Sequence, residues 1–334
     1  MVPIALLGAW HVHTRNFIDR LHESGEGKIV VVWDEDRARG KSCAEKYGVP
    51  FEPSLDAALG YPGVKAVMVE AATVQHTDII IKAAEAGKHV FSDKVLAPST
   101  AECEKIREAL ERRGLSFVVS MEAKANAPYR YAEKLIAGGK LGKVSSAYFR
   151  RDHGAALERF LPDYWYDTRQ TGGGVTIDLG CHGFYLLNQF CGTPKKITCL
   201  MNELCGTGAD ENSTTVIEFE NGAIGTAHTS FVSWKMDNLL EIIGTEGMLV
   251  ASGTNAAQYR VFLQSRHLPG YETLSPVPAP EYGGNDVLPI VTFARLVKNG
   301  EKSDNRYGID RALTLTRIIE CAYESARTGK TINY

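Results

Sequence analysis

The first 121 residues alternate short apolar runs with longer helical patterns, and this alternation constrains the fold more than any other feature of the chain. The apolar runs have the length of strands and lie at residues 3–8, 29–33, 64–69, 89–91 and 116–120. Helical patterns separate them, at residues 14–24, 37–47, 77–86 and 100–113. Strands that alternate with helices at this spacing predict βαβ units, and therefore a doubly wound parallel sheet with helices on both faces.

The pattern changes after residue 120, where strands begin to follow one another directly. A helix at 129–137 and a strand at 144–150 precede strands at 197–204, 214–219, 223–231, 239–244, 248–251 and 259–263. Asn221-Gly222 is a strong hairpin signal, and 244–247 suggests a second tight turn. Consecutive hairpins predict a mostly antiparallel, open sheet in an α+β domain, closed by helices at 286–298 and 309–327. We therefore predict a dinucleotide-binding domain at 1–121 and a substrate-binding and oligomerisation domain at 122–334.

The charge and the cysteine content exclude several classes of function. The 334 residues carry a net charge of −3, so no basic surplus exists to neutralise phosphates, and we expect no nucleic acid partner. The longest apolar runs are too short to span a bilayer and no signal peptide is evident, so we expect no membrane partner. The seven cysteines form no CxxC pair, which favours reduced thiols in the cytoplasm.

The turn after the first apolar run is where a sheet of this kind binds a dinucleotide. Such a site favours G-x-G-x-x-G, whereas this chain reads Gly8-Ala9-Trp10-His11-Val12-His13, with only the first glycine. Asp34 ends the second apolar run. A carboxylate there can accept hydrogen bonds from the ribose of NAD and would repel the extra phosphate of NADP. The alternative is a surface aspartate in the acidic run 34–36.

His11 and His13 leave a second interpretation open. An H-x-H after the first strand is also how many metal-dependent amidohydrolase barrels begin, since imidazoles are common zinc ligands. A barrel would need further ligands at later strand ends, where His76 and His182 are the candidates. The hairpin-rich later chain argues against eight βα units, so we expect no metal site.

The segment Gly172-Gly173-Gly174-Val175-Thr176-Ile177-Asp178-Leu179-Gly180-Cys181-His182 is the candidate site of chemistry. Glycines let the backbone turn tightly and approach what it binds, and the apolar spacing that follows predicts a helix. On a helix Asp178 and His182, four residues apart, share one face. A carboxylate beside an imidazole is a usable acid/base pair. The alternative is a glycine-rich loop before a helix whose polar side faces water.

Aromatic and charged residues near this segment are candidates for a substrate pocket. Arg151 and His153 end the strand that begins at 144, and Trp165 lies just before the glycines. Aromatic faces with hydrogen-bonding groups suit a sugar ring. A surface pairing of the arginines and a core position of the aromatics are equally consistent with the sequence. If Arg151 reaches the pocket, an acidic sugar becomes a plausible substrate.

These features together resemble the glucose–fructose oxidoreductase, inositol dehydrogenase and rhizopine-catabolism (Gfo/Idh/MocA) family of NAD(P)-dependent oxidoreductases. The resemblance rests on the doubly wound first domain, on Asp34, on Asp93-Lys94 after the run 89–91, and on the G-G-G-x-x-x-D-x-x-x-H segment. It covers nearly the whole chain. The chain departs from the family at Val95, where E-K-P has its proline, at Asp78, where T-P-N-x-x-H has its histidine, and at Tyr185, where aspartate is frequent.

The resemblance implies roles for individual residues. Lys94 would contact substrate and nicotinamide, and Asp178 and His182 would be the catalytic aspartate and histidine. The implied cofactor-binding residues are Gly8, Ala9, Trp10, His11, Val12, Asp34, Ala72, Thr73, Gln75, His76, Asp93 and Lys94. The implied or candidate substrate-binding residues are Lys94, Arg151, His153, Trp165, Asp178 and His182.

The implied activity is hydride transfer between NAD, with NADP possible, and a secondary alcohol of a sugar, sugar derivative or cyclitol. His182 would be the general base, Lys94 would stabilise the alkoxide, and Asp178 would orient His182 or bind a second hydroxyl. The family also admits NAD-dependent redox-cycling glycosidases or lyases, which show no net reduction of NAD. An antiparallel sheet with one open face often pairs with a copy of itself, so we expect a homo-oligomer, a dimer or a tetramer.

Overall fold

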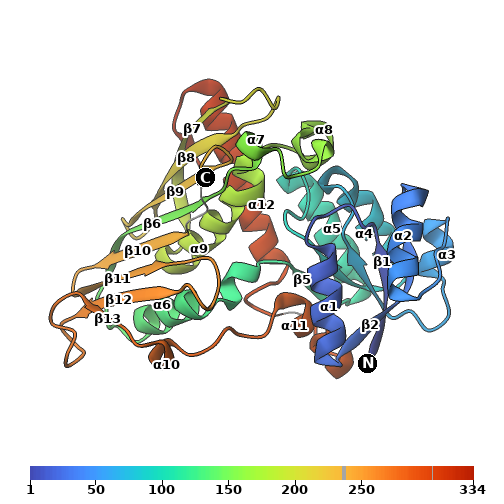
Figure 1. Cartoon of the computed structure of the whole chain (residues 1–334), viewed down its shortest axis with the longest axis horizontal. Helices are drawn as coiled ribbons and strands as arrows, with labels where there is room; N and C mark the ends of the chain where they lie inside the picture. The colour runs from blue at the N-terminus through green and yellow to red at the C-terminus, as the bar shows by residue number, and fades with distance from the viewer. Residues whose placement is uncertain (235–237, 303) are drawn as a thin grey trace. The chain divides into compact units, whose positions relative to one another are not determined.

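The computed structural model describes residues 1–234, 238–302 and 304–334, and its chain divides into two compact units (Figure 1). The first unit comprises Met1–Met121 and Val287–Thr316, and the second comprises Glu122–Asp286 and Arg317–Tyr334. The predicted second domain, 122–334, thus contains a stretch, 287–316, that clusters with the first unit. In the described part of the chain, no helix combines the length and the apolar character needed to cross a membrane.

The first unit is built on a parallel sheet of the predicted doubly wound type. Its strands are β1 (Val2–Leu7), β2 (Gly27–Trp33), β3 (Ala66–Val69), β4 (His89–Ser92) and β5 (Phe117–Val119). They lie in the order β2-β1-β3-β4-β5 and pair in parallel throughout. Phe51 adds an isolated parallel bridge to Val32, beyond β2, where a further strand of a dinucleotide-binding sheet would lie.

Amphipathic helices cover this sheet because each turns one apolar stripe inward. They are α1 (Thr14–Ser24), α2 (Arg37–Tyr47), α3 (Leu55–Leu59), α4 (His76–Glu85), α5 (Thr100–Arg113) and α11 (Pro289–Asn299), with the short 3₁₀ turn η1 (Thr73–Gln75). Helix α11 explains why the chain returns to this unit. Its Phe293 ring lies 5.9 Å from the ring of Phe91, on β4, and both side chains are fully buried.

The second unit contains a nine-stranded sheet in the order β13-β12-β11-β10-β6-β9-β8-β7-β14. The strands are β6 (Val144–Asp152), β7 (Pro194–Asn202), β8 (Asn212–Phe219), β9 (Ile224–Ser230), β10 (Leu239–Gly244), β11 (Gly247–Ser252), β12 (Arg260–Ser265), β13 (Ser275–Pro276) and β14 (Ile332–Asn333). The pairing is antiparallel except between β6 and β9, which confirms the predicted mostly antiparallel sheet. Both predicted hairpins are present: Gly222, with φ 86°, lies between β8 and β9, and Gly244 pairs with Gly247.

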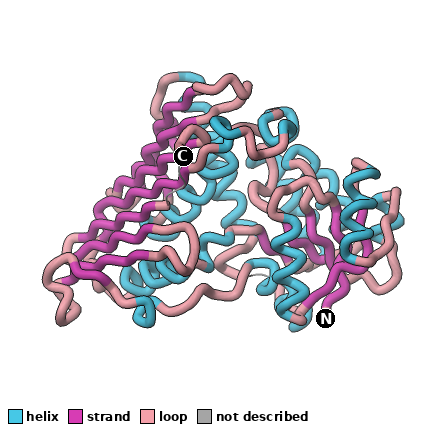
Figure 2. Tube along the Cα trace, in the orientation of Figure 1, coloured by secondary structure: helices cyan, strands magenta, loops and turns pink. Residues whose placement is uncertain are grey.

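The helices of this unit cover one face of the sheet (Figure 2). They are α6 (Ala127–Ala137), α7 (Ala155–Glu158), α8 (Thr168–Thr171), α9 (Cys181–Cys191), α10 (Ala279–Tyr282) and the end of α12 (Ile309–Thr328), with the short turns η2 (Glu122–Ala125), η3 (Asp163–Tyr166) and η4 (Thr176–Gly180). Helix α9 packs on β6 and β9 at Gly183, where a Cβ would lie 2.9 Å from Ala227 and 3.1 Å from Phe149. Glycine therefore allows the close approach of the helix to the sheet.

Candidate functional site

The turn after β1 is shaped by a glycine and by hydrogen bonds to its neighbours. Gly8 has φ 89°, and a Cβ there would lie 2.5 Å from the backbone nitrogen of Ala71. The amides of Trp10 and His11 both donate to the backbone oxygen of Glu70 at 3.1 Å. The Trp10 side chain is buried in the core. Although two glycines of the usual motif are missing, hydrogen bonds to the residue after β3 hold the backbone of this turn in place.

A cavity of about 240 Å³ adjoins this turn within the first unit. The turn and the start of α1 contribute Ala9, His11, Val12, Thr14, Arg15 and Ile18, and α2 contributes Arg39, Ser42, Cys43, Lys46 and Tyr47. The N-terminus of a helix and three cationic side chains favour an anionic ligand. The residues present therefore fit the phosphate-bearing part of a dinucleotide.

Both carboxylate oxygens of Asp34 accept hydrogen bonds from within the protein. Its side chain is 1% exposed, and its two oxygens accept hydrogen bonds from Ala9 N at 2.7 Å and Asp36 N at 2.8 Å. The Arg39 guanidinium adds a bidentate contact, at 2.9 and 2.6 Å. Neighbouring Glu35 is exposed and accepts a hydrogen bond from the Gln75 amide. Asp34 thus holds the turn, and Glu35 presents the more accessible carboxylate.

The residues after β3 divide into a structural and an accessible group. His76 is buried: Nε2 faces the Ala71 oxygen at 3.0 Å, and Nδ1 faces the oxygens of Val95 and Leu96 at 3.1 Å each. It therefore links the end of β3 to the loop that follows Lys94. Ala72 and Thr73, also buried, lie just ahead of Gln75 in the same turn.

Three buried side chains converge at the ends of β1, β3 and β4: His11, Glu70 and Asp93. His11 Nε2 lies 2.6 Å from Asp93 Oδ2, and His11 Nδ1 accepts from His13 N at 3.2 Å. Burial raises the pKa of Asp93, but His11 and Lys94 lower it further, and the net pKa is about 2. Glu70 was not among the predicted site residues, although an acidic residue directly after a buried strand indicates a position at the ligand-binding edge of such a sheet.

The amidohydrolase alternative is wrong, because the sheet of the first unit is an open five-stranded one rather than a closed eight-stranded barrel. His11 and His13 are neighbours, with ring centroids 5.1 Å apart. His182, the further ligand that a barrel would have needed, belongs to the other unit.

Gly173 and Gly174 allow close contacts with other parts of the second unit. Added Cβ atoms would overlap Tyr323 at Gly173 and Asp210 at Gly174. The Asp210 carboxylate accepts from Gly174 N and Thr176 N, each at 2.8 Å, and from the Tyr323 hydroxyl at 2.8 Å. These contacts fix the start of the predicted acid/base segment. No local signal in the sequence marked Asp210, because it lies 36 residues from Gly174.

Asp178 and His182 lie in different helical turns. Thr176–Gly180 forms a π-helical turn, η4, and α9 begins at Cys181. Asp178 and His182 therefore do not lie on one regular α-helix as had been predicted. Asp178 Oδ2 accepts a hydrogen bond from the Trp165 indole at 3.2 Å. The structure therefore brings together Asp178 and Trp165, two of the predicted substrate-binding residues.

His182 is paired with Tyr185. The two residues share one face of α9, and His182 Nδ1 lies 2.6 Å from the Tyr185 hydroxyl, which also accepts from Ala123 N at 3.1 Å. Burial raises the pKa of Tyr185 well above its usual value, so this hydroxyl remains protonated at neutral pH. A phenol can donate to Nδ1 or accept from it, and so it can serve either tautomer of the imidazole.

The three other predicted substrate-binding residues, His153, Arg151 and Lys94, have different environments. His153 stacks on Phe231, with ring centroids 5.0 Å apart and an interplanar angle of 11°. Its Nδ1 accepts from Ala155 N at 3.3 Å, which suits a structural role at the end of β6. Arg151 belongs to the face of β6 that packs against helix α9, and Lys94 is a buried residue of the first unit.

Comparison with known proteins relates both units to one group. A family model described as an oxidoreductase family with an NAD-binding Rossmann fold matches residues 2–121, and a GFO/IDH/MocA C-terminal domain model matches residues 129–250.

Curated relatives align over nearly the whole chain. The chain is 28% identical to scyllo-inositol 2-dehydrogenase (NAD(+)) of Bacillus subtilis, over 99% of this chain and 96% of that protein. It is 25% identical to D-xylose 1-dehydrogenase (NADP(+)) 2 of Haloferax volcanii, over 98% of both. A solved structure of levoglucosan dehydrogenase with NADH and levoglucosan has a TM-score of 0.86, at 18% identity over 99% of both chains, and so shares the fold.

Proposed function

Because the chain belongs to the GFO/IDH/MocA family of oxidoreductases with an NAD-binding Rossmann fold, we propose that it transfers a hydride between NAD and a secondary alcohol of a sugar, sugar derivative or cyclitol. The observation that carries the proposal is the parallel sheet β2-β1-β3-β4-β5, with Gly8 in the turn after β1 and Lys94 just after β4. The curated dehydrogenases of xylose and scyllo-inositol support the class of substrate.

The first unit would hold the cofactor, which supplies hydride transfer when bound. The cavity beside the turn, with Val12, Arg15 and Arg39, would take its phosphates. Glu35 and Gln75, which pair with each other at the ends of β2 and β3, would take the adenosine ribose. Asp34 would act through the turn, since its oxygens already bind Ala9, Asp36 and Arg39. A carboxylate at Glu35 favours NAD over NADP by repelling an added phosphate.

Lys94 and His182 are the residues that we propose for stabilising charge and for moving a proton in the reaction. Lys94 would stabilise the developing alkoxide by its charge. His182 would take the hydroxyl proton during oxidation, in the tautomer whose Nδ1–H donates to Tyr185. Asp178, which binds Trp165, would bind a further substrate hydroxyl.

A panel of sugars and cyclitols with NAD and NADP tests the proposal, read by the absorbance of reduced cofactor. We expect NADH to form with at least one member of the panel. Release of an aglycone from a glycoside without net NADH would identify the redox-cycling alternative instead. Failure of the chain to bind either reduced cofactor would overturn the proposal.

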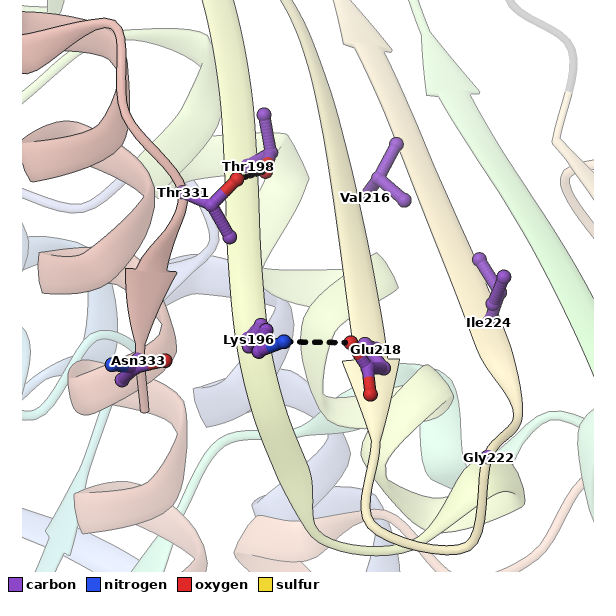
Figure 3. A pocket seen from close by; sticks show the side chains of 8 residues that line it. All are labelled: Lys196, Thr198, Val216, Glu218, Gly222, Ile224, Thr331 and Asn333. Atoms are coloured by element: carbon purple, nitrogen blue, oxygen red, sulfur yellow. Dashed lines mark hydrogen bonds and ion pairs between the residues drawn. The ribbon is translucent and has the colours of Figure 1, made fainter.

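We further propose that the second unit pairs with a copy of itself. The outer face of its sheet, opposite α9, exposes apolar side chains on neighbouring strands: Leu200, Val216, Ile224, Ile243 and Phe262. A shallow pocket lies on this face between Lys196, Val216, Ile224 and Asn333 (Figure 3). A second copy would cover these side chains. Light scattering should give the mass of a dimer or tetramer for the wild type and a smaller mass for Val216→Lys.

The protein's location is proposed from its thiols. All seven cysteines are free in the structure, and burial raises the pKa of Cys191 to about 12 and that of Cys43 to about 11. Buried, protonated thiols suit a reducing compartment, and we propose the cytoplasm.

A further inference from the structure

Arg151 lies on the helix-covered face of β6. Side chains alternate along a strand, so Ala147, Phe149 and Arg151 share one face, and Phe149 is the residue on which α9 packs at Gly183. The next residue back, Arg150, is on the other face, where its Nε lies 3.5 Å from the Asp152 carboxylate. Adjacent arginines therefore serve opposite faces of one sheet.

The strand register places Arg151 beside the start of α9. Arg151 pairs with Thr229 of β9, and a Cβ on Gly180, at the end of η4, would lie 3.4 Å from the Thr229 methyl group. On its other side, the register of β10 on β6 puts Asn238 opposite Arg151, one step beyond the pair of Leu239 and Arg150. The arginine is thus next to the turn that carries Asp178 and leads into His182.

Polar atoms of this cluster lack protein partners among the residues that the structure describes. The Arg151 Nε is buried without a hydrogen-bond acceptor, and the Asn238 Oδ1 is buried without a donor. A buried polar group left without a partner is destabilising, because it has lost its hydrogen bonds to water. Such a cost is offset when a ligand supplies the missing hydrogen bonds, which is the ordinary arrangement at a binding site.

Positive charge accumulates around the His182–Tyr185 pair. The ammonium of Lys124, a buried residue, lies 5.7 Å from the centre of the Tyr185 ring. Burial raises the pKa of Tyr185; the nearby charge of Arg151 opposes that rise, whereas the Glu122 carboxylate adds to it.

We infer that Arg151 binds a carboxylate of the substrate, so that the sugar oxidised at His182 is an acid such as a hexuronate or an aldonate. The planar guanidinium matches a carboxylate through two parallel hydrogen bonds, which a neutral hydroxyl cannot form. Asn238 would bind an adjacent hydroxyl. This inference rests on the proposed dehydrogenase function and names the substrate class of the same site.

The test compares neutral sugars with the acids derived from them. Glucose with glucuronate and galactose with galacturonate are assayed with NAD, using wild type, Arg151→Met, Arg151→Lys and Arg150→Met. We expect kcat/KM to favour an acid about a hundredfold in wild type. In Arg151→Met we expect KM for the acid to rise with little change in kcat, so that the preference is lost. Arg151→Lys keeps the positive charge without the bidentate guanidinium geometry and should retain part of the preference. Arg150→Met, on the other face, keeps the preference within about twofold.

Thermal unfolding with each sugar supplies a second measurement that needs no turnover. We expect an acid, and not its neutral parent, to raise the melting temperature of wild type and of Arg150→Met but not of Arg151→Met. Turnover of neutral sugars in preference to acids, or no stabilisation of wild type by any acid, overturns the inference. Absence of NADH with every sugar while acids still stabilise wild type would instead count against the dehydrogenase function and leave the carboxylate site supported.

Discussion

The two units each contain a buried histidine that lies 2.6 Å from another side chain, and the two neighbouring side chains differ in kind. In the first unit, His11 Nε2 lies 2.6 Å from the Asp93 carboxylate, and His11 Nδ1 accepts a hydrogen bond from the backbone amide of His13. His182 in the second unit lies 2.6 Å from a phenol whose oxygen also accepts an amide. A carboxylate can only accept, so it fixes the proton of its partner, whereas a phenol can donate or accept. The first pair suits structure, and the second suits proton transfer.

The strongest test of this contrast replaces each histidine with glutamine. We expect His182→Gln to lower kcat by about 10²–10⁴-fold, the usual contribution of a general base, while NADH binding is retained. His11→Gln should instead weaken folding and NADH binding together. Steady-state kinetics and fluorescence titration with NADH measure both, and an unchanged kcat in His182→Gln would show that another group takes the proton.

Lys94→Met should lose turnover by about a hundredfold or more, on the scale of one lost electrostatic contact, without loss of NAD affinity. The measurement is kcat with a saturating sugar substrate, beside the dissociation constant of NADH. Lys143→Met, an exposed lysine before β6, is the matched control and should retain wild-type turnover. Near-normal turnover of the Lys94 variant would exclude the lysine from the reaction.

Asp93→Asn should lower the free energy of unfolding by about 3–5 kcal/mol, because it removes the carboxylate that lies 2.6 Å from the buried His11 imidazole. Urea unfolding measures the change, with exposed Asp36→Asn as the control, since asparagine is as good a helix cap as aspartate. Equal stability of the Asp93 and Asp36 variants would mean that the carboxylate of the first pair adds nothing to folding.

The pH dependence of stability should show the same carboxylate. The pKa of Asp93 in the folded protein, about 2, is below the unfolded value of about 3.9. The resulting stability is therefore present above about pH 4 and is lost as the pH falls through 2. Between pH 5 and pH 2, the free energy of unfolding should fall more steeply with decreasing pH in wild type than in Asp93→Asn. Equal slopes of the free energy against pH would contradict the assignment.

Tyr185→Phe tests the second pair with the smallest expected effect. Loss of the hydroxyl should lower kcat about tenfold and alter the pH dependence of kcat, since His182 loses the group that serves both its tautomers. Tyr148→Phe, on the outer face of the same sheet, is the control. A change in stability with an unaltered pH profile would reduce Tyr185 to a packing residue.

Regular patterning explains why so much of the fold was predictable. Helix α1, for example, buries Phe17, Ile18 and Leu21, and its bounds match the predicted 14–24. The partner of a helix is a different matter: the apolar side of α11 was evident, but nothing local showed that Phe293 joins Phe91. An amphipathic pattern reports which side is buried and not which core it enters.

The site was less predictable because long-range contacts define it. The π-helical turn η4 depends on the Asp210 carboxylate, which caps the amides of Gly174 and Thr176 from a distant loop. Asp34 was predicted as a ribose ligand, and its two hydrogen bonds from the Arg39 guanidinium are evident only in the folded structure. The catalytic and substrate roles of Lys94, Asp178 and His182 stay predictions for the experiments above.

The return of the chain at Val287 limits how this architecture can be divided or recombined. A fragment that stops at Met121 would lack α11, and the Phe91 side chain that Phe293 covers would then face water. Such a fragment should be prone to aggregation, and a chimera that exchanges residues 122–334 as one block would import a foreign α11 into the first unit. An exchange of the second unit would therefore have to replace two segments together, 122–286 and 317–334, and leave α11 with the sheet that it completes.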